Sequence, residues 1–272
     1  MSARPPAPET FLSGRVGHVG PRRAVVMRAL DRALDLELRA RRAADALDRL
    51  AEAVPRRRVL ALSVFRPDAS RATAVAEALA ESRHDVRVER GPAREGGKFQ
   101  NLNELLRDAG PGDYDWLLVA DDDVVLPERF TDRMIGVCER LDFGLAQPAQ
   151  TLASHAAWPV TRRKARSLAR ETGFVEIGPV TVLRRDVAAE LTPFPDLRFG
   201  WGLDLHWAAV ARDRGWTMAV VDALPVRHDE AGVASSYAHA DAVAEAAEFL
   251  AKHPFVPREQ AGRTLAVHRR LG

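Results

Sequence analysis

The sequence predicts an α/β protein in which a mainly parallel sheet is flanked by helices and preceded by an N-terminal helical extension. Three observations predict this class. Apolar runs of strand length alternate with helical segments over residues 57–253, an order typical of parallel sheets with helices on their faces. The 272 residues suffice for one large core. No repeat of solenoid length interrupts the alternation, so we expect one catalytic-size domain with halves near residues 57–150 and 151–230.

The N-terminal region divides into an arm and a helix. Residues 1–21 carry prolines at positions 5, 6, 8 and 21 and predict a flexible arm. Residues 22–56 place apolar side chains at helical spacing up to Pro55 and predict one long amphipathic helix. This helix could pack on the outside of the domain or mediate oligomerisation. We favour packing, because the apolar stripe is broken around Arg41 and Arg42.

Strand-like and helix-like segments follow one another through the rest of the chain. The predicted strands are short and rich in apolar residues, and they cover residues 58–64, 85–89, 116–120, 144–147, 173–183 and 218–221. The predicted helices carry apolar residues at helical spacing and cover residues 68–81, 96–108, 127–141, 204–214 and 236–252. Gly178 and Pro179 interrupt the fifth strand. Residues 254–272 are assigned to a C-terminal tail.

Composition excludes some partners. The 40 Lys and Arg against 38 Asp and Glu leave a formal charge of +2, too balanced for a nucleic-acid-binding surface. The single cysteine, Cys138, cannot form an internal disulfide, and its helical context argues against an activated thiol. The N-terminus lacks a hydrophobic signal segment, and no apolar run reaches the roughly 18 residues that span a bilayer. We therefore expect a cytoplasmic protein without nucleic-acid partner or transmembrane segment; peripheral membrane attachment and oligomeric state stay open.

Three consecutive aspartates, Asp121 to Asp123, follow the most apolar predicted strand. Ligands of parallel sheets collect at the carboxyl ends of strands. If the extended backbone continues, Asp121 and Asp123 point to one side and Asp122 to the other. Converging carboxylates repel unless a cation neutralises them, and hard oxygen ligands favour Mg²⁺ or Mn²⁺. A turn or helix cap also uses Asp, but one Asp suffices there, so we favour a cation site.

The segment YDWLLVADDDVVLP resembles the aspartate motif of GT-A glycosyltransferases, closest in style to family 2. Downstream, FVEIGPVTVLRR, PFPDLRFGWGLDLHW and DALPVRH resemble, in the same order, the acceptor segment, the segment of glycine, tryptophan and acid, and the terminal histidine of such enzymes. The resemblance covers about residues 58–229. It implies a Rossmann-like GT-A fold of the nucleotide-diphospho-sugar transferases, with the donor bound by residues 57–150 and the acceptor by residues 151–230.

The resemblance also implies roles for single residues. Asp123 is implied to bind a divalent cation, Mn²⁺ or Mg²⁺, while Asp121 and Asp122 contact the nucleotide-sugar donor. The matching histidine, His228, is implied as a second ligand, since imidazole is acceptable to Mn²⁺; a lone loop histidine would otherwise be structural. Asp204 is implied as the base that takes the proton of the acceptor, whereas its position alone predicts a helix cap.

Four further residues are predicted to bind the donor. Lys98 and Asn101 lie in GGKFQNLN, where two glycines before a helix expose backbone N–H groups that favour anions. This segment is not a P-loop, so the alternative is a capped helix with a surface lysine; the resemblance favours donor binding. Phe65 and Arg66 end the first predicted strand, where the fold commonly holds a nucleobase and ribose. A loop with an exposed arginine is the alternative there.

The predicted function is metal-dependent, inverting transfer of a sugar from a nucleoside-diphosphate sugar to an acceptor hydroxyl. Glu176 and Trp201 lie in the two acceptor-like segments and are predicted to contact the acceptor. A Mg-dependent phosphohydrolase of haloacid dehalogenase type is an alternative, but its Asp-x-Asp belongs on the first strand. A non-catalytic nucleotide-sugar-binding protein of the same fold is the other alternative. The sequence does not indicate the nucleotide, the sugar or the acceptor.

Overall fold

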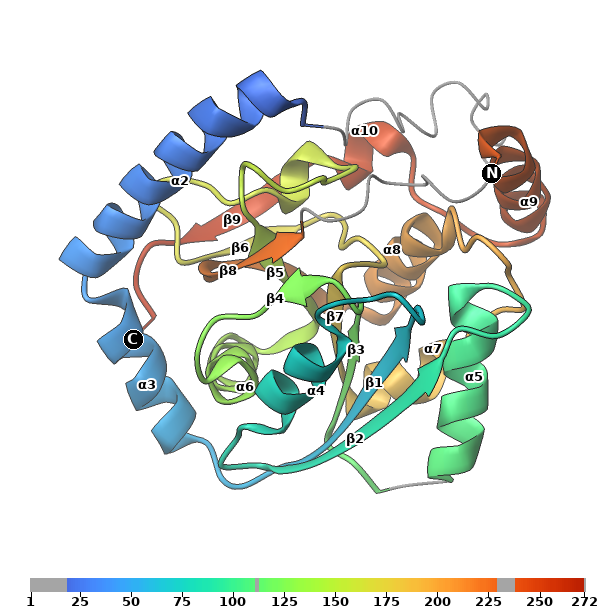
Figure 1. Ribbon diagram of the computed structural model, residues 1–272, viewed down its shortest axis with the longest axis horizontal. Coiled ribbons are helices and arrows are strands. Elements are labelled where there is room, and N and C mark those ends of the chain that lie inside the picture. Colours follow the sequence, from blue (N-terminus) through green and yellow to red (C-terminus); the bar gives the residue numbers. More distant parts are fainter. Residues whose placement is uncertain (1–18, 111–112, 229–237, 272) are drawn as a thin grey trace.

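The computed structural model describes residues 19–110, 113–228 and 238–271, which form one mixed sheet with helices on both faces (Figure 1). The strand order is β2-β1-β3-β7-β5-β8-β6-β9, and β4 pairs with β8 beside this path. Most of the predicted N-terminal arm, residues 1–18, lies outside the described residues. The α/β class with flanking helices and an N-terminal helical extension is confirmed.

The strands of the sheet are β1 (Arg58–Phe65), β2 (Asp85–Pro92), β3 (Trp116–Ala120), β4 (Val124–Val125), β5 (Phe143–Gln150), β6 (Ala169–Thr172), β7 (Val180–Arg184), β8 (Thr217–His228) and β9 (Thr264–His268). β1 pairs in parallel with β2 and β3, and β5 pairs in parallel with β8. The pairs β3–β7, β5–β7, β6–β8, β6–β9 and β4–β8 are antiparallel. The sheet is therefore mixed, and the prediction of a mainly parallel sheet is wrong. Parallel neighbours need a crossover, usually a helix, and the chain between β5 and β7 forms no α-helix.

The helices divide between the two faces of the sheet. They are α2 (Pro21–Ala40), α3 (Ala43–Ala53), α4 (Ala72–Ala80), α5 (Lys98–Ala109), α6 (Phe130–Leu141), α7 (Arg185–Leu191), α8 (Leu203–Arg214), α9 (His239–Lys252) and α10 (Arg258–Ala261). One core cluster joins α3, α4 and α6 to the sheet, and a second joins α5, α7, α8 and α9 to its other face (Figure 1). None of the described helices combines the length and apolar character needed to cross a membrane.

The strands β1 and β3 are buried on both faces, which explains their continuous apolar sequences. In β1, Leu60 and Leu62 enter the core with α5 and α8, while Val59 and Ala61 enter the core with α3 and α6. Neighbouring side chains on a strand point to opposite faces, so a strand covered twice needs apolar residues at every position. The carboxyl ends of both strands are thereby held rigidly at one edge.

The predicted long N-terminal helix is two helices, α2 and α3, which corrects the prediction for residues 22–56. The break falls at Arg42, whose φ of 52° is left-handed. It lets α3 turn onto α6, where a Cβ at Gly136 would lie 2.7 Å from the backbone nitrogen of Ala51. Only glycine permits this approach, so the packing of α3 on α6 favours two helices where the sequence pattern predicted one.

Three strand predictions differ from the structure. The predicted strand 173–183 is interrupted, because residues 173–179 leave the sheet between β6 and β7. β8 runs on past its predicted end to His228, since the carboxylate of Asp222 is paired inside the sheet with Arg170 of β6, Nε to Oδ2 at 2.8 Å. The predicted C-terminal tail contains β9, whose alternating sequence adds an edge strand beside β6.

Candidate active site

Charged side chains that follow two neighbouring strands meet at one edge of the sheet. Because β1 and β3 are parallel, Arg66 after β1 and Asp121 after β3 leave the sheet at the same edge. Lys98 is the first residue of α5, which follows β2, and its side chain reaches the same edge. Its Nζ lies 2.5 Å from Oδ1 of Asp121 and donates to the carbonyl of Ile177 at 3.0 Å. Three of the predicted donor-binding residues therefore lie at one edge.

Asp122 and Asp123 share one guanidinium. Arg66 donates from Nη2 to Oδ1 of Asp122 at 2.9 Å and to Oδ2 of Asp123 at 3.1 Å. Its backbone N–H also donates to Oδ2 of Asp122 at 2.6 Å. The expected alternation of the triplet is wrong, because Asp122 and Asp123 form a turn between β3 and β4 rather than extended strand. Both carboxylates are more than nine-tenths buried, and the single charge of Arg66 offsets part of their negative charge there.

His228 lies beside Asp123 because of strand pairing. β4 begins directly after Asp123, and its antiparallel register with β8 places Val124 opposite His228. Nε2 of His228 lies 3.0 Å from Oδ1 of Asp123. Burial opposes the charge on Asp123, but the hydrogen bond and charge of His228, together with Arg66, hold its pKa below the usual value. Burial also opposes the charge on His228, and the bond to Asp123 outweighs it, so the pKa of His228 is raised.

The pair of Asp123 and His228 offers the ligand types of a divalent-cation site. A carboxylate oxygen and an imidazole nitrogen suit Mn²⁺, and Mg²⁺ sites commonly use one or two carboxylates with substrate phosphates. Nδ1 of His228 is buried and finds no hydrogen-bond partner among the residues that the structure describes. Within those residues, no three His, Cys, Asp or Glu side chains form a complete metal-binding group. The residues present therefore fit a cation whose remaining ligands come from a substrate.

The segment 176–179 joins the aspartates to the opposite side of the site. The backbone N–H of Asp121 donates to the carbonyl of Pro179 at 2.8 Å. A Cβ on Gly178 would lie 2.9 Å from Oδ2 of Asp121 and 3.4 Å from Nζ of Lys98. Glycine thus allows this segment to pass against the ion pair of Lys98 and Asp121, which brings the predicted acceptor residue Glu176 to the same edge.

Glu176 forms no ion pair with Lys or Arg among the described residues; hydrogen bonds hold it, and the charge of His228 also acts on it. Its Oε2 accepts from Nε2 of Gln150 at 2.8 Å and from Oγ1 of Thr161 at 3.0 Å. Burial raises the pKa of Glu176 to about 7, and these hydrogen bonds oppose the rise only in part. Sequence reasoning missed Gln150, because the predicted strand 144–147 ends three residues before it, whereas β5 continues to Gln150.

Asp204 is a buried carboxylate of the site on whose pKa no described cation acts. It lies in the first turn of α8 and is 7% exposed, and its Oδ1 accepts from the N–H of Leu205 at 2.9 Å. Gly202, with a φ of 84°, occupies the N-cap position, so Asp204 is not the cap that the alternative expected. Burial, and then the negative charge of Glu176, raise the pKa of Asp204 to about 8. A carboxyl group in this range can exchange a proton near neutral pH.

The other predicted contacts lie around this edge with different surroundings. Phe65 is half-buried, and the guanidinium of Arg90 lies 4.9 Å from its ring centroid. Asn101 is 5% exposed, and its amide bonds the N–H of Arg94 and the carbonyl of Gly97. Asn101 therefore fastens the loop that leads to α5. Trp201 is 8% exposed, with the ring of His239 edge-on at 5.2 Å.

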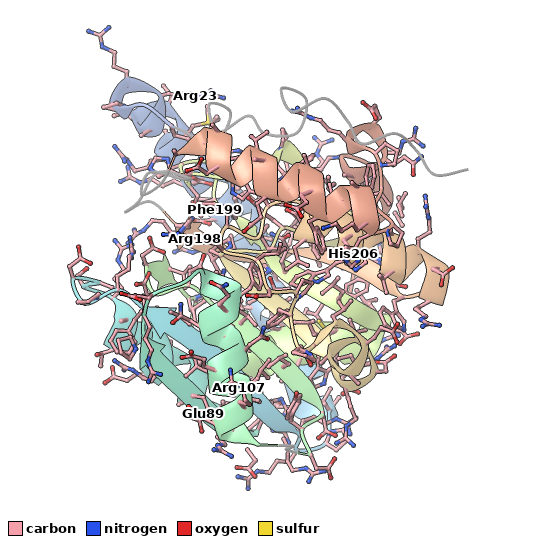
Figure 2. The ribbon with its side chains drawn as sticks, turned by 90° about the vertical axis from the view of Figure 1, so that its right-hand side faces the viewer. Arg23, Glu89, Arg107, Arg198, Phe199 and His206 are labelled. Atoms are coloured by element: carbon pink, nitrogen blue, oxygen red, sulfur yellow. The ribbon has the colours of Figure 1, made fainter. Side chains whose placement is uncertain are left out.

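Glu245 of α9 is a structural residue of the site that the sequence did not reveal. Its carboxylate accepts the backbone N–H groups of Arg198, Phe199 and Gly200 at 2.6, 2.9 and 3.1 Å. These residues lead directly into Trp201 and Asp204, and Figure 2 labels Arg198 and Phe199 on this loop beside α9. The alanine-rich sequence around Glu245 reads as an ordinary exposed helix, so nothing in it signals the contact.

Comparisons with known proteins identify the family. The family model described as Glycosyltransferase like family 2 matches residues 40–241. The mannosyltransferase PcManGT from Pyrobaculum calidifontis, solved in complex with GDP-Man and Mn²⁺, is similar at a TM-score of 0.52 and 15% identity, over 88% of this chain and 78% of that one. The search of curated proteins finds no match.

Two further solved structures are similar at lower scores. A197 from STIV matches at a TM-score of 0.44 and 16% identity, over 64% of this chain and 87% of that one. TarS 1–349 from S. aureus, in complex with UDP-GlcNAc, matches at a TM-score of 0.44 and 10% identity, over 66% and 62%. Because the family model covers most of the chain, the chain belongs to the family 2-like glycosyltransferases and is a glycosyltransferase with the GT-A fold.

Proposed function

We propose that this glycosyltransferase moves a sugar from a nucleoside-diphosphate sugar to an acceptor hydroxyl, with a divalent cation and with inversion at the anomeric carbon. The observation that carries the proposal is the meeting of Asp123 and His228, 3.0 Å apart, at the sheet edge that also holds Lys98 and Arg66. Anionic and cationic groups in one place suit a ligand that brings both phosphates and a metal ion.

The donor half would bind the nucleotide-sugar through residues that form ion pairs with one another in this structure. Lys98 and Arg66 are cations whose present partners are Asp121 and Asp122. A diphosphate offers both cations a competing anion, and Arg in particular matches phosphate geometry. Asp121 and Asp122 would then contact the ribose or the sugar, with Phe65 against the base. Asn101 would act through the loop that it fastens.

Asp123 and His228 would hold the cation, either Mn²⁺ or Mg²⁺. When bound, the cation would supply Lewis-acid stabilisation of the charge that develops on the leaving diphosphate. The protein's part is to hold a carboxylate and an imidazole together through the register of β4 and β8. The mannosyltransferase of the same fold is described with GDP-Man and Mn²⁺, so this donor and cation are the first pair to test.

The acceptor half would bind the hydroxyl and take its proton. The carboxylate of Asp204 would accept the proton as the acceptor oxygen bonds to the anomeric carbon and the bond from that carbon to the diphosphate oxygen breaks. Glu176 and Trp201 would contact the acceptor beside it. The raised pKa of Asp204 supports this role, since a general base works best when its pKa lies near the working pH. A single displacement with one base gives inversion.

The two alternatives receive less support. A phosphohydrolase of haloacid dehalogenase type places its nucleophilic aspartate after the first strand, whereas Asp121 follows β3, and the family match favours sugar transfer. A non-catalytic nucleotide-sugar-binding protein would not need a buried carboxyl group with a pKa of about 8.

A thermal-shift panel tests the proposal. Nucleoside diphosphates and their sugars, GDP-Man first, are added with Mn²⁺, with Mg²⁺ and with chelator. Ligand binding raises the unfolding temperature by mass action, so we expect a rise that needs both nucleotide and cation. Release of phosphate from simple phosphoesters would support the phosphohydrolase, and the absence of any nucleotide-dependent rise would contradict the proposal.

A further inference from the structure

The helix α2 separates its charges between two sides. Its acids turn toward the domain, where Asp31 accepts the backbone N–H groups of residues 152 and 153, and Asp35 pairs with Arg163 at 2.8 Å. Glu37 accepts the N–H of Arg166 at 2.8 Å and pairs with Arg41. The inward side of α2 is therefore fixed by polar contacts, with every acid of the helix engaged.

The outward side of α2 carries arginines and an apolar stripe. The exposed arginines of this side are Arg22, Arg28, Arg32 and Arg39, and within the described part of the chain none of them pairs with an acid. Between them lie apolar side chains at helical spacing, Val25, Val26, Ala29, Ala33 and Leu36, all exposed. Val25 and Leu36 are each 61% exposed and Val26 is 55% exposed. A surface helix normally turns its aliphatic residues toward the core, whereas α2 exposes a stripe of them to solvent.

We propose that the outward face of α2 binds an anionic lipid surface, with the apolar stripe at the level of the acyl chains and the arginines at the headgroups. An interfacial helix needs this pattern, a stripe of aliphatic residues bordered by cations whose long stems reach the phosphates. The charge segregation supplies the electrostatic part, since basic side chains near anionic lipids each add to membrane affinity. The inference does not depend on the proposed function.

A second copy of the chain fits this face less well. Self-association through α2 would bring two sets of exposed arginines together, and the acids that could neutralise them are already bonded to the domain. Like charges across an interface are repulsive, whereas anionic headgroups neutralise the same arginines.

The placement of α2 relates the lipid surface to the active site. Val19, two residues before the helix, donates its N–H to Nδ1 of His155 at 3.2 Å, and the N–H of His155 donates to the carbonyl of His228 at 2.9 Å. Two hydrogen bonds through His155 therefore connect the N-terminal end of α2 to the backbone of His228, the proposed cation ligand. Figure 2 labels Arg23 at this end of the helix, at the edge of the molecule.

Vesicle sedimentation of the full chain tests the inference. One set of vesicles contains phosphatidylcholine with phosphatidylglycerol, and the other contains phosphatidylcholine alone. We expect the protein to sediment with the anionic vesicles and to be released by high salt. Arg28→Gln/Arg32→Gln should weaken this binding roughly 30-fold, from the affinity that each basic residue adds. Val25→Ser/Val26→Ser/Leu36→Ser should weaken it as strongly through the stripe.

The control removes the same charge elsewhere. Arg107 and Arg140 are exposed on α5 and α6, and Figure 2 labels Arg107 on the opposite side of the molecule from Arg23. Arg107→Gln/Arg140→Gln should therefore keep vesicle binding. Equal loss in this control, full binding by the α2 variants, or no sedimentation with anionic vesicles at low salt would each overturn the proposal. A dimer in solution that the stripe variant disperses would assign the face to a second copy instead.

Discussion

The carboxylates on the two sides of the active site differ in what neutralises them. On the proposed donor side, Asp121 pairs with Lys98, while Asp122 and Asp123 share Arg66, and Asp123 also bonds His228. On the proposed acceptor side, Glu176 has hydrogen bonds and the charge of His228, and Asp204 has backbone N–H groups and a nearby negative charge.

This difference separates two kinds of chemistry within one edge of the sheet. Carboxylates surrounded by cations stay ionised and can bind a metal ion or exchange their partners with phosphates. Carboxyl groups that are buried without a cation hold their protons up to near neutral pH, and so they can take up or release one during a reaction. Each variant described below changes residues on one side of the site and leaves the other side unchanged.

The largest expected effect is on sugar transfer in Asp204→Asn. If Asp204 takes the acceptor's proton, the variant should transfer sugar roughly 10²-fold more slowly or worse. Nucleotide and metal affinity should be unchanged, because the donor side is intact. Asp213→Asn, an exposed change on the same helix α8, is the matched control and should transfer normally. Near-normal transfer by Asp204→Asn would leave the base unassigned.

The same variant should also change the pH dependence of stability. The pKa of Asp204 is raised to about 8 in the folded state, so between about pH 4 and pH 8 the folded protein holds a proton that the unfolded chain has lost. The free energy of unfolding should therefore fall as pH rises through this window. Asp204→Asn removes that fall, so its stability relative to the wild type should increase by roughly 3–4 kcal/mol between pH 5 and pH 8. Urea unfolding at pH 5 and pH 8 measures both values, and parallel curves for the two proteins would contradict the raised pKa.

On the donor side, Arg66→Gln should destabilise the fold. Asp122 and Asp123 would keep their burial and lose the shared guanidinium, and an unpaired buried group costs roughly 1–3 kcal/mol. The guanidinium is partly exposed, which places the effect toward the lower end. Arg87→Gln, which removes only exposed contacts with Glu89 and with the carbonyl of Ala109, should cost less than about 1 kcal/mol. Equal losses in the two variants would show that the aspartates do not need Arg66.

A smaller effect is expected from Glu245→Ala. The change leaves three N–H groups of the loop 198–200 without their acceptor. This loop leads into Trp201 and Asp204, so we expect both side chains to be held less firmly. We expect transfer to fall roughly tenfold with an increased KM for the acceptor, while nucleotide binding stays the same. Glu248→Ala, on the same helix and paired only with Lys252 among the described residues, should behave as the wild type. A loss of nucleotide affinity in Glu245→Ala would contradict this division.

The sequence predicted the parts of the fold that depend on local pattern. The apolar runs of β1 and β3 and the aspartates after β3 were correctly located, because burial on both faces leaves a continuous apolar sequence. The sequence could not show that Arg42 breaks the N-terminal helix or that Arg170 lets Asp222 remain inside β8, since both depend on distant partners. The role of Glu245 was invisible for the same reason.

The candidate site was predictable to a similar degree. Residue types and motif order indicated Asp123, His228 and Lys98, and the structure brings Asp123 to His228 and Lys98 to Asp121. The alternation expected for the triplet failed, because the chain turns at Asp122 to begin β4. The different surroundings of the acceptor carboxylates depend on burial, which no local pattern reveals.

The central claim is that the donor side binds a nucleoside diphosphate through a cation at Asp123. Titration calorimetry of GDP into the wild type and into Asp123→Asn, each with Mn²⁺ and with chelator, tests it most directly. Asn keeps the size of the side chain and removes the charge that a cation needs. We predict that the wild type binds GDP in the presence of Mn²⁺ and that this binding is lost in chelator and in Asp123→Asn. GDP affinity that is the same in all four experiments would contradict the claim.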